Sequence, residues 1–225
     1  MVDIIAIGAH PDDVEITMGG TVARLVRQGL KVGLLDLTDG EPTPAGSPEI
    51  RADEMRRAAE VLGVEWRITL DLPNRYLMDT VEAREKVAGV LREHRPRIMV
   101  CHHWDDYHPD HVQAHALCIA ARFYGKLTKT DMPGEPYLVP HIIFWQPQHL
   151  SYAFKPSFII GLDEQDFAKK VEALRCYASQ FAAKDWLNDR MAAFNRYYGG
   201  LIGRPYGEPF VSKREIGLDS FNALL

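Results

Sequence analysis

The chain has 225 residues, of which 46% are hydrophobic and 25% charged, with a formal net charge of −5; this composition is ordinary for a soluble globular protein and the length is enough for one well-buried α/β core. The negative charge argues against nucleic acid as a partner, and no apolar run approaches the ~20 residues of a membrane-spanning helix, so we expect no membrane association. Three cysteines without C-x-x-C spacing, Cys101, Cys118 and Cys176, argue against a disulfide framework and a cysteine-bound zinc, and favour a reducing, cytoplasmic compartment.

The first half of the chain alternates predicted strands and helices. Ile4–Gly8 is a short apolar run typical of a buried strand, and its flanks lack the basic residues of a signal peptide. Val14–Gly29 has apolar residues at helical spacing, and Gly29 ends that helix. The elements that follow are a strand at Lys31–Leu37, a loop at Thr38–Pro48, a helix at Glu49–Leu62, a strand at Glu65–Leu72, a helix at Thr80–His94, a strand at Ile98–His102 and a helix from Pro109 to about Phe123.

The second half is less regular. The β-α-β-α order before it predicts one α/β domain with a Rossmann-like, mostly parallel sheet flanked by helices and an irregular C-terminal lobe. That lobe is expected to contain strands at Pro140–Gln146 and Ser157–Ile160, helices at Asp163–Ala178 and Trp186–Tyr198, and an edge strand within Tyr206–Leu218.

Polar clusters follow three of the predicted strands. They are Ala9–Asp13, Thr38–Glu41 and Cys101–His111. Because ligands bind beyond the carboxyl ends of parallel strands, we expect all three clusters to line one crevice. The first strand is followed by Gly8-Ala9-His10-Pro11 and an acidic pair rather than by G-x-G-x-x-G, which argues against a dinucleotide.

His10, Asp13 and His111 are the candidate metal ligands. Two imidazoles and one carboxylate suit zinc and leave a position for water, although iron, cobalt or manganese accept similar ligands. Asp12 can then act as a general base without binding the metal. Two simpler interpretations stay open, because Asp13 could be only a helix N-cap and His108 could cap the helix that starts at Pro109.

Several motifs together resemble those of the LmbE-like, or PIG-L, deacetylase family. The resemblance extends from Ile5 to about Ser212, and its C-terminal part is similar to the branch of bacillithiol-biosynthesis deacetylases. The motifs are Ala9-His10-Pro11-Asp12-Asp13-Val14-Glu15 with Gly19-Gly20, Thr38-Asp39-Gly40-Glu41 with Arg51, His108-Pro109-Asp110-His111, and Tyr206-Gly207-Glu208-Pro209-Phe210.

This resemblance implies a zinc-dependent hydrolase that removes the N-acetyl group from a glucosamine conjugate, with N-acetylglucosaminyl malate as the substrate of the bacillithiol branch. It also implies that zinc binds His10, Asp13 and His111, and that a homo-oligomer forms. Asp12 would be the base, His108 would act at the tetrahedral intermediate or leaving group with Asp110 orienting it, and Arg51 would bind substrate. The alternatives are another N-acetylglucosamine compound, such as a chitooligosaccharide, a mycothiol-type precursor or an antibiotic precursor, and a non-catalytic metal-dependent sugar-binding protein.

Other residues are weaker candidates for contacts with the sugar. Glu41, in a Pro-rich loop, and His149, in the C-terminal lobe, are expected to reach the substrate, while His149 could equally be a surface residue. One of Tyr197, Tyr198 and Arg196 could supply an oxyanion donor, although neighbouring aromatic residues more often pack in a core. The sequence leaves open the roles of Glu15 (orienting His108 or capping a helix), of His103, of Tyr198 and of the segment 126–137.

Overall fold

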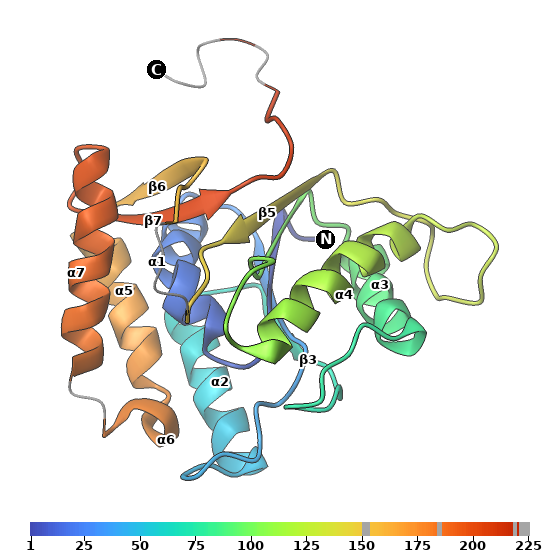
Figure 1. The fold of residues 1–225 in the computed structure, drawn as a ribbon, viewed down its shortest axis with the longest axis horizontal. Helices are drawn as coiled ribbons and strands as arrows, with labels where there is room; N and C mark the ends of the chain where they lie inside the picture. Colours follow the sequence, from blue (N-terminus) through green and yellow to red (C-terminus); the bar gives the residue numbers. More distant parts are fainter. Residues whose placement is uncertain (150–153, 184–185, 218–219, 221–225) are drawn as a thin grey trace.

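The computed structural model describes residues 1–149, 154–183, 186–217 and 220 (Figure 1). In these residues one seven-stranded sheet has the order β3-β2-β1-β4-β5-β7-β6. The first five strands in that order pair in parallel, and β7 pairs antiparallel with both β5 and β6. The strands are β1 (Ile4–Gly8), β2 (Val32–Asp36), β3 (Trp66–Thr69), β4 (Ile98–Cys101), β5 (His141–Trp145), β6 (Phe158–Leu162) and β7 (Tyr206–Val211).

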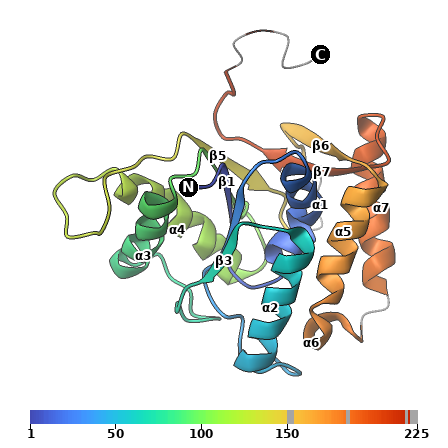
Figure 2. The ribbon, with the colours of Figure 1, turned by 180° about the vertical axis from the view of Figure 1, so that it is seen from behind.

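Helices cover both faces of the sheet, which is why β1 and β2 are buried along their whole length. Successive β1 residues point to opposite faces: Ile5 and Ile7 join the core cluster under α3 (Val81–His94) and α4 (Pro109–Gly125), whereas Ile4 and Ala6 join the cluster under α1 (Asp13–Arg27), α2 (Pro48–Leu62) and α5 (Glu164–Arg175). The view from behind shows the same two layers, with α7 (Trp186–Leu201) beside α5 (Figure 2). The predicted Rossmann-like architecture is confirmed.

Local signals place most helix ends correctly. Gly29 and Gly63 have positive φ values of 86° and 70°, the backbone conformation that glycine favours after a helix. Ser47 and Thr80 accept hydrogen bonds from the amides of Ile50 and Ala83, three residues ahead, as N-cap residues do. The helix expected at Asp163–Ala178 was too long, because α5 ends at Arg175 and a separate short helix, α6 (Ala178–Phe181), follows it.

The predicted edge strand near the C-terminus is not at the edge. β7 lies between β5 and β6, and β6 is the edge strand. Pairing with β5 involves only Phe210 and Val211, so it stops before Pro209, whose nitrogen cannot donate a hydrogen bond. β7 pairs with β6 and β5, which lie about 50 and 65 positions earlier in the chain. This pairing depends on tertiary packing, so no local sequence pattern predicts it.

Glu208 of β7 ties three elements together. Helix α1 is interrupted at Met18 (φ −137°, ψ 21°), and the amides of Gly20 and Thr21 beyond the interruption donate to the two Glu208 carboxylate oxygens at 3.1 and 2.6 Å. Lys170 of α5 donates to the same carboxylate at 2.5 Å, and both partners are buried. Gly20 suits this close packing, because a Cβ at this position would clash with the Leu162 side chain. The Tyr206–Phe210 motif is therefore part of the scaffold.

We expect Glu208→Ala to lower the free energy of unfolding by about 3–5 kcal/mol, because it leaves the Lys170 ammonium buried without its partner. Urea unfolding followed by circular dichroism measures the change. The matched control is Glu172→Ala, which removes an exposed ion pair with Lys169 at 2.8 Å and should cost at most ~1 kcal/mol. Equal losses in the two variants would contradict the assignment.

Within the described residues, no helix combines the length and apolar character needed to cross a bilayer.

Candidate active site

A cavity of about 360 Å³ lies beyond the carboxyl ends of β1, β2 and β4. Residues from all three predicted polar clusters line it, so the expectation of one shared crevice is confirmed. Its wall includes the predicted site residues His10, Asp12, Asp13, Arg51, His108, His111 and His149.

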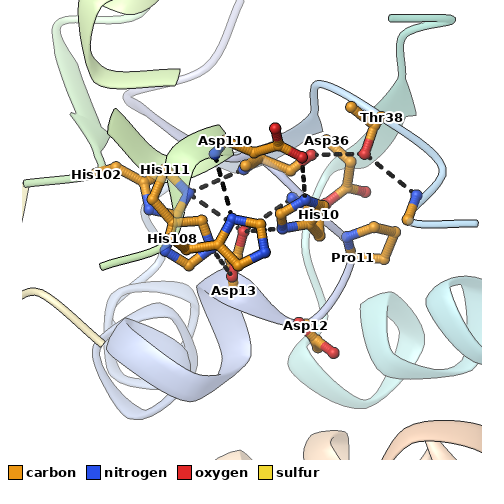
Figure 3. A network of polar contacts seen from close by, with 12 residues as sticks. His10, Pro11, Asp12, Asp13, Asp36, Thr38, His102, His108, Asp110 and His111 are labelled. Carbon is orange, nitrogen blue, oxygen red and sulfur yellow. Dashed lines mark hydrogen bonds and ion pairs between the residues drawn. The ribbon is translucent and has the colours of Figure 1, made fainter. Parts of the chain in front are cut away.

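His10 lies between two carboxylates. Its Nε2 donates to Asp110 Oδ2 at 3.1 Å, and its Nδ1 is 3.5 Å from Asp13 Oδ2 (Figure 3). Asp110 was expected to orient His108, and this prediction is wrong for the side chain: the carboxylate holds His10 and also accepts the Arg75 amide at 2.8 Å. With Nε2 donating to Asp110, Nδ1 is the ring nitrogen that faces Asp13 and would bind a cation.

His111 repeats this arrangement with a different carboxylate. Its Nδ1 is 3.2 Å from Asp106 Oδ2, and its Nε2 is 3.3 Å from Asp13 Oδ1. Metal-bound histidines usually donate their second ring N–H to a carboxylate, which fixes the ring and its tautomer. Sequence reasoning missed Asp106, although an acidic residue two positions before His108 in the same loop was a usable signal.

Three groups of three residues could each hold a cation, because the donor atoms within each group all lie within 4.8 Å of one another. The groups overlap, and His111 belongs to all three. The predicted ligands combine members of the first two. His102 is a poor ligand, because its Nε2 already accepts the Ala9 amide at 2.9 Å. The predicted set of His10, Asp13 and His111 is not itself one of the three groups, but its two histidines face the Asp13 carboxylate at 3.5 and 3.3 Å. The groups are His10/His108/His111, Asp13/His102/His111 and Asp106/His111/His149.

Neighbouring carboxylates raise the pKa values of both candidate histidine ligands. Burial lowers the pKa of His10, but the hydrogen bonds and charges of Asp110 and Asp13 outweigh it and raise this pKa to about 10. Burial likewise lowers the pKa of His111, and Asp13 and Asp106 raise it to about 9. A divalent cation bound here would displace these protons while satisfying the same carboxylates.

We expect Asp106→Asn to weaken metal affinity about 10–100-fold, because the amide cannot accept the His111 Nδ1 proton as strongly as the carboxylate and the ring loses its fixed orientation. Competition with a chromophoric chelator measures the affinity. Asp105→Asn, at an exposed position in the same loop, is the control and should bind metal as the unchanged protein does. Unchanged affinity in Asp106→Asn would remove Asp106 from the site.

Asp12 lines the cavity outside the three donor groups. In Figure 3 it lies apart from the imidazoles, with its carboxylate pointing away from them, and Oδ2 is 3.1 Å from Arg51 Nη2. Asp12 occupies the N-cap position of α1 in a left-handed conformation (φ 103°) without a side-chain cap bond, so Asp13 is not the N-cap. Burial raises the pKa of Asp12 to about 7, against the lowering effect of Arg51. Such a pKa suits a general base near neutral pH.

His108 caps α4 and also lines the cavity. Its Nδ1 accepts the Asp110 amide at 3.2 Å, which places the ring proton on Nε2. Burial, together with the charges of His111 and His10, lowers the pKa of His108 to about 4. The capping interpretation and the functional one are therefore compatible, and the neutral ring offers an N–H donor.

The remaining predicted substrate residues divide into two groups. Arg51 lines the cavity and contacts Asp12, and His149 lies at the cavity with its ring centroid 5.4 Å from that of His111. Glu41 does not line the cavity, and its carboxylate accepts hydrogen bonds from the amide and hydroxyl of Thr43. Tyr197 is 63% exposed on α7 and is absent from the cavity wall.

Glu15 neither orients His108 nor caps α1. Its Oε1 accepts hydrogen bonds from Arg67 and from the Tyr177 hydroxyl. His103 is buried, stacks on Trp104 and contacts the backbone of Asp105 outside the cavity wall.

Tyr198 packs against Phe194 and Tyr197 on α7. The segment 126–137 projects beyond α4 (Figure 1), where Arg92 of α3 donates to the carbonyls of Leu127, Met132 and Gly134. These parts of the chain serve packing rather than the site.

The structure adds cavity residues outside every recognised motif. Gln148 donates its side-chain amide to the Asp13 carbonyl, and its backbone amide to Asp106. Gln180 of α6 donates to Thr43, which joins the C-terminal lobe to the loop after β2. None of these positions carries a local sequence signal, because long-range packing brings them to the cavity. The added wall residues include Asn74, Arg75, Gln148, Gln180 and Phe181.

Comparison with known proteins places this site in a family. The family model described as PIG-L, GlcNAc-PI de-N-acetylase, matches residues 5–122, which include the predicted ligands His10, Asp13 and His111. The chain belongs to the PIG-L family. Members related to it are N-deacetylases, and the chain is accordingly an amide hydrolase, as its motifs predicted. The bacillithiol branch stays a prediction.

Individual relatives of this PIG-L chain agree with the assignment. The diacetylchitobiose deacetylase of Thermococcus kodakarensis is 31% identical, over 91% of this chain and 80% of its own. The 1D-myo-inositol 2-acetamido-2-deoxy-alpha-D-glucopyranoside deacetylase 2 of Catenulispora acidiphila is 28% identical, over 86% and 78%. The crystal structure of a conserved protein, TT1542, from Thermus thermophilus is 37% identical over 97% of both chains, with a TM-score of 0.90.

Proposed function

We propose that this chain is a zinc-dependent hydrolase that removes the acetyl group from the nitrogen of a small N-acetylglucosamine conjugate. The observation that carries the proposal is the paired geometry of His10 and His111: each ring has one nitrogen on a carboxylate and the other facing Asp13. Asp12 and His108 line the same cavity and remain outside that ligand set.

His10, Asp13 and His111 would hold the zinc ion. When bound, zinc polarises a carbonyl and makes water more acidic, and these are the two effects that amide hydrolysis needs.

The chain's own residues then handle the protons. Asp12 takes a proton from the water that attacks the acetyl carbon, and the Nε2–H of His108 stabilises the oxygen of the tetrahedral intermediate. Collapse of this intermediate breaks the C–N bond. The proton held by Asp12 goes to the departing amine, which is a poor leaving group unless it is protonated. The products are acetate and a free amino sugar.

The cavity volume of about 360 Å³ suits one acetamido sugar with a small aglycone. Malate remains our proposed aglycone only through the resemblance to the bacillithiol branch. The Tyr206–Phe210 motif that suggested this branch serves the scaffold through Glu208 and does not line the cavity, so it favours no aglycone. Diacetylchitobiose and a glucosaminyl inositol, which the relatives' names indicate for those proteins, are the alternatives.

Acetate release from these three conjugates by metal-quantified protein tests the proposal. We expect release from at least one conjugate, its loss in chelator and its return with zinc. Metal-loaded protein that binds the conjugates but releases no acetate would show a sugar-binding protein instead. A homo-oligomer, expected from the family resemblance, is a separate proposal that sedimentation analysis tests.

A further inference from the structure

The turn that presents Asp12 is held by one nitrogen of Arg51. Arg51 Nη2 donates both to the Pro11 carbonyl and to Asp12 Oδ2. One acceptor is the carbonyl of the peptide that precedes Asp12, and the other is the Asp12 carboxylate. Asp12 has a φ of 103°, which is unfavourable for a residue with a side chain. The position of the Asp12 carboxylate therefore depends on where the Arg51 guanidinium lies.

Hydrogen bonds alone do not fix that guanidinium. Arg51 is 3% exposed, and its Nε and Nη1 have no hydrogen-bond partner among the described residues. Its Cζ instead lies 5.3 Å from the centroid of the Tyr177 ring. A buried aromatic face attracts a guanidinium at this distance and restricts the plane in which it lies.

The Tyr177 ring is in turn fixed from its other end. Its hydroxyl donates to Glu15 Oε1 at 2.8 Å, and Arg67 Nη1 donates to the same oxygen at 2.5 Å. Arg67 also makes a bidentate contact of 2.6 and 2.8 Å with Asp36, the last residue of β2. The side chains of Glu15, Asp36 and Tyr177 are fully buried. A chain of contacts thus runs from the central sheet to Asp12.

We propose that Tyr177 is a positioning residue for Asp12, acting through the Arg51 guanidinium. The proposal rests on the proposed function, in which Asp12 is the base. Tyr177 does not line the cavity, so it has no direct contact to offer the substrate. Its loss should therefore lower kcat, because the base is misaligned, and leave KM nearly unchanged.

The test compares Tyr177→Leu with Tyr177→Phe. We expect Tyr177→Leu to lower kcat at least about tenfold with KM within about twofold. Tyr177→Phe keeps the ring beneath Arg51 and should recover most of that loss. Tyr137→Leu is the matched control: this ring lies 4.5 Å from the Arg95 guanidinium and its hydroxyl donates to Pro96, at the opposite end of β4. It should keep the kcat of the unchanged protein.

Metal content and thermal unfolding of each variant separate positioning from a loss of folded protein. If Tyr177→Leu does not fold, Tyr177→Met, which fills a similar volume, takes its place. A folded variant without the ring that retains the full kcat would overturn the proposal, as would one that loses kcat only in proportion to its metal.

Crystal structures of the same variants give an outcome independent of activity. We expect Asp12 to leave its left-handed conformation, or to lose its contact with Arg51, in the variant without the ring, and a variant in which both features are unchanged would overturn the proposal. If the unchanged protein releases acetate from no conjugate, the proposed function fails, and this structural comparison still decides whether Tyr177 positions Asp12.

Discussion

Asp12→Asn is expected to lower kcat for acetate release by about 10²–10⁴-fold while metal content stays near that of the unchanged protein. Asparagine has nearly the same shape and its oxygen can still accept the Arg51 hydrogen bond, but it cannot take a proton from water. Asp12 belongs to none of the three donor groups that could hold a cation, so the metal should remain.

The measurements are steady-state kinetics and the metal stoichiometry of the purified variant. Asp39→Asn is the control, because Asp39 is exposed in the loop after β2 and its carboxylate accepts a hydrogen bond from the Glu41 amide. This control should keep full activity. Loss of metal from Asp12→Asn, or a kcat within about threefold of the starting value, would refute the assignment of Asp12 as the base.

Removing Asp13 should abolish metal binding and, with it, activity. Its carboxylate lies 3.5 Å from His10, 3.2 Å from His102 and 3.3 Å from His111, and it is 2% exposed. It is the one anionic member of the predicted ligand set. Asp13→Ala leaves two imidazoles that repel each other when protonated and lack the charge that attracts a divalent cation.

Metal content of purified Asp13→Ala, measured by plasma mass spectrometry, should be below about a tenth of an equivalent, with no acetate released. Asp106→Asn should fall between this variant and the unchanged protein, because it only loosens one ligand. Asp105→Ala serves as the control. A stoichiometric, chelator-resistant metal in Asp13→Ala would exclude Asp13 as a ligand and require a different set, such as one containing His108.

The family motifs and the structure give different information about the candidate metal ligands. The motifs name the ligand types and their order in the chain. The structure supplies the physical reason that His10 and His111 are suited to a cation, because Asp110 and Asp106 fix their second nitrogens. It also shows that Arg51, expected only to bind substrate, already holds Asp12.

The sequence by itself determined the elements and the edge of the sheet at which the site lies. Apolar periodicity and a glycine that ends a helix, such as Gly29, act within a few residues, so they can be recognised without a structure. Parallel strand order then brings His10 and His111 together, because the carboxyl ends of β1 and β4 are neighbours.

Only the tertiary structure decided which carboxylate serves which partner. Asp110 lies two residues from His108 yet holds His10, a hundred positions away, while Glu15 beside the ligand motif turns to Arg67 and Tyr177. Glu208 likewise came from a motif that suggested a substrate branch and instead ties α1 to α5. A buried carboxylate that is left unpaired costs several kcal/mol, so it pairs with whichever donors the packing brings to it. Which donors these are depends on contacts between distant segments, and the spacing of residues in the sequence does not report those contacts.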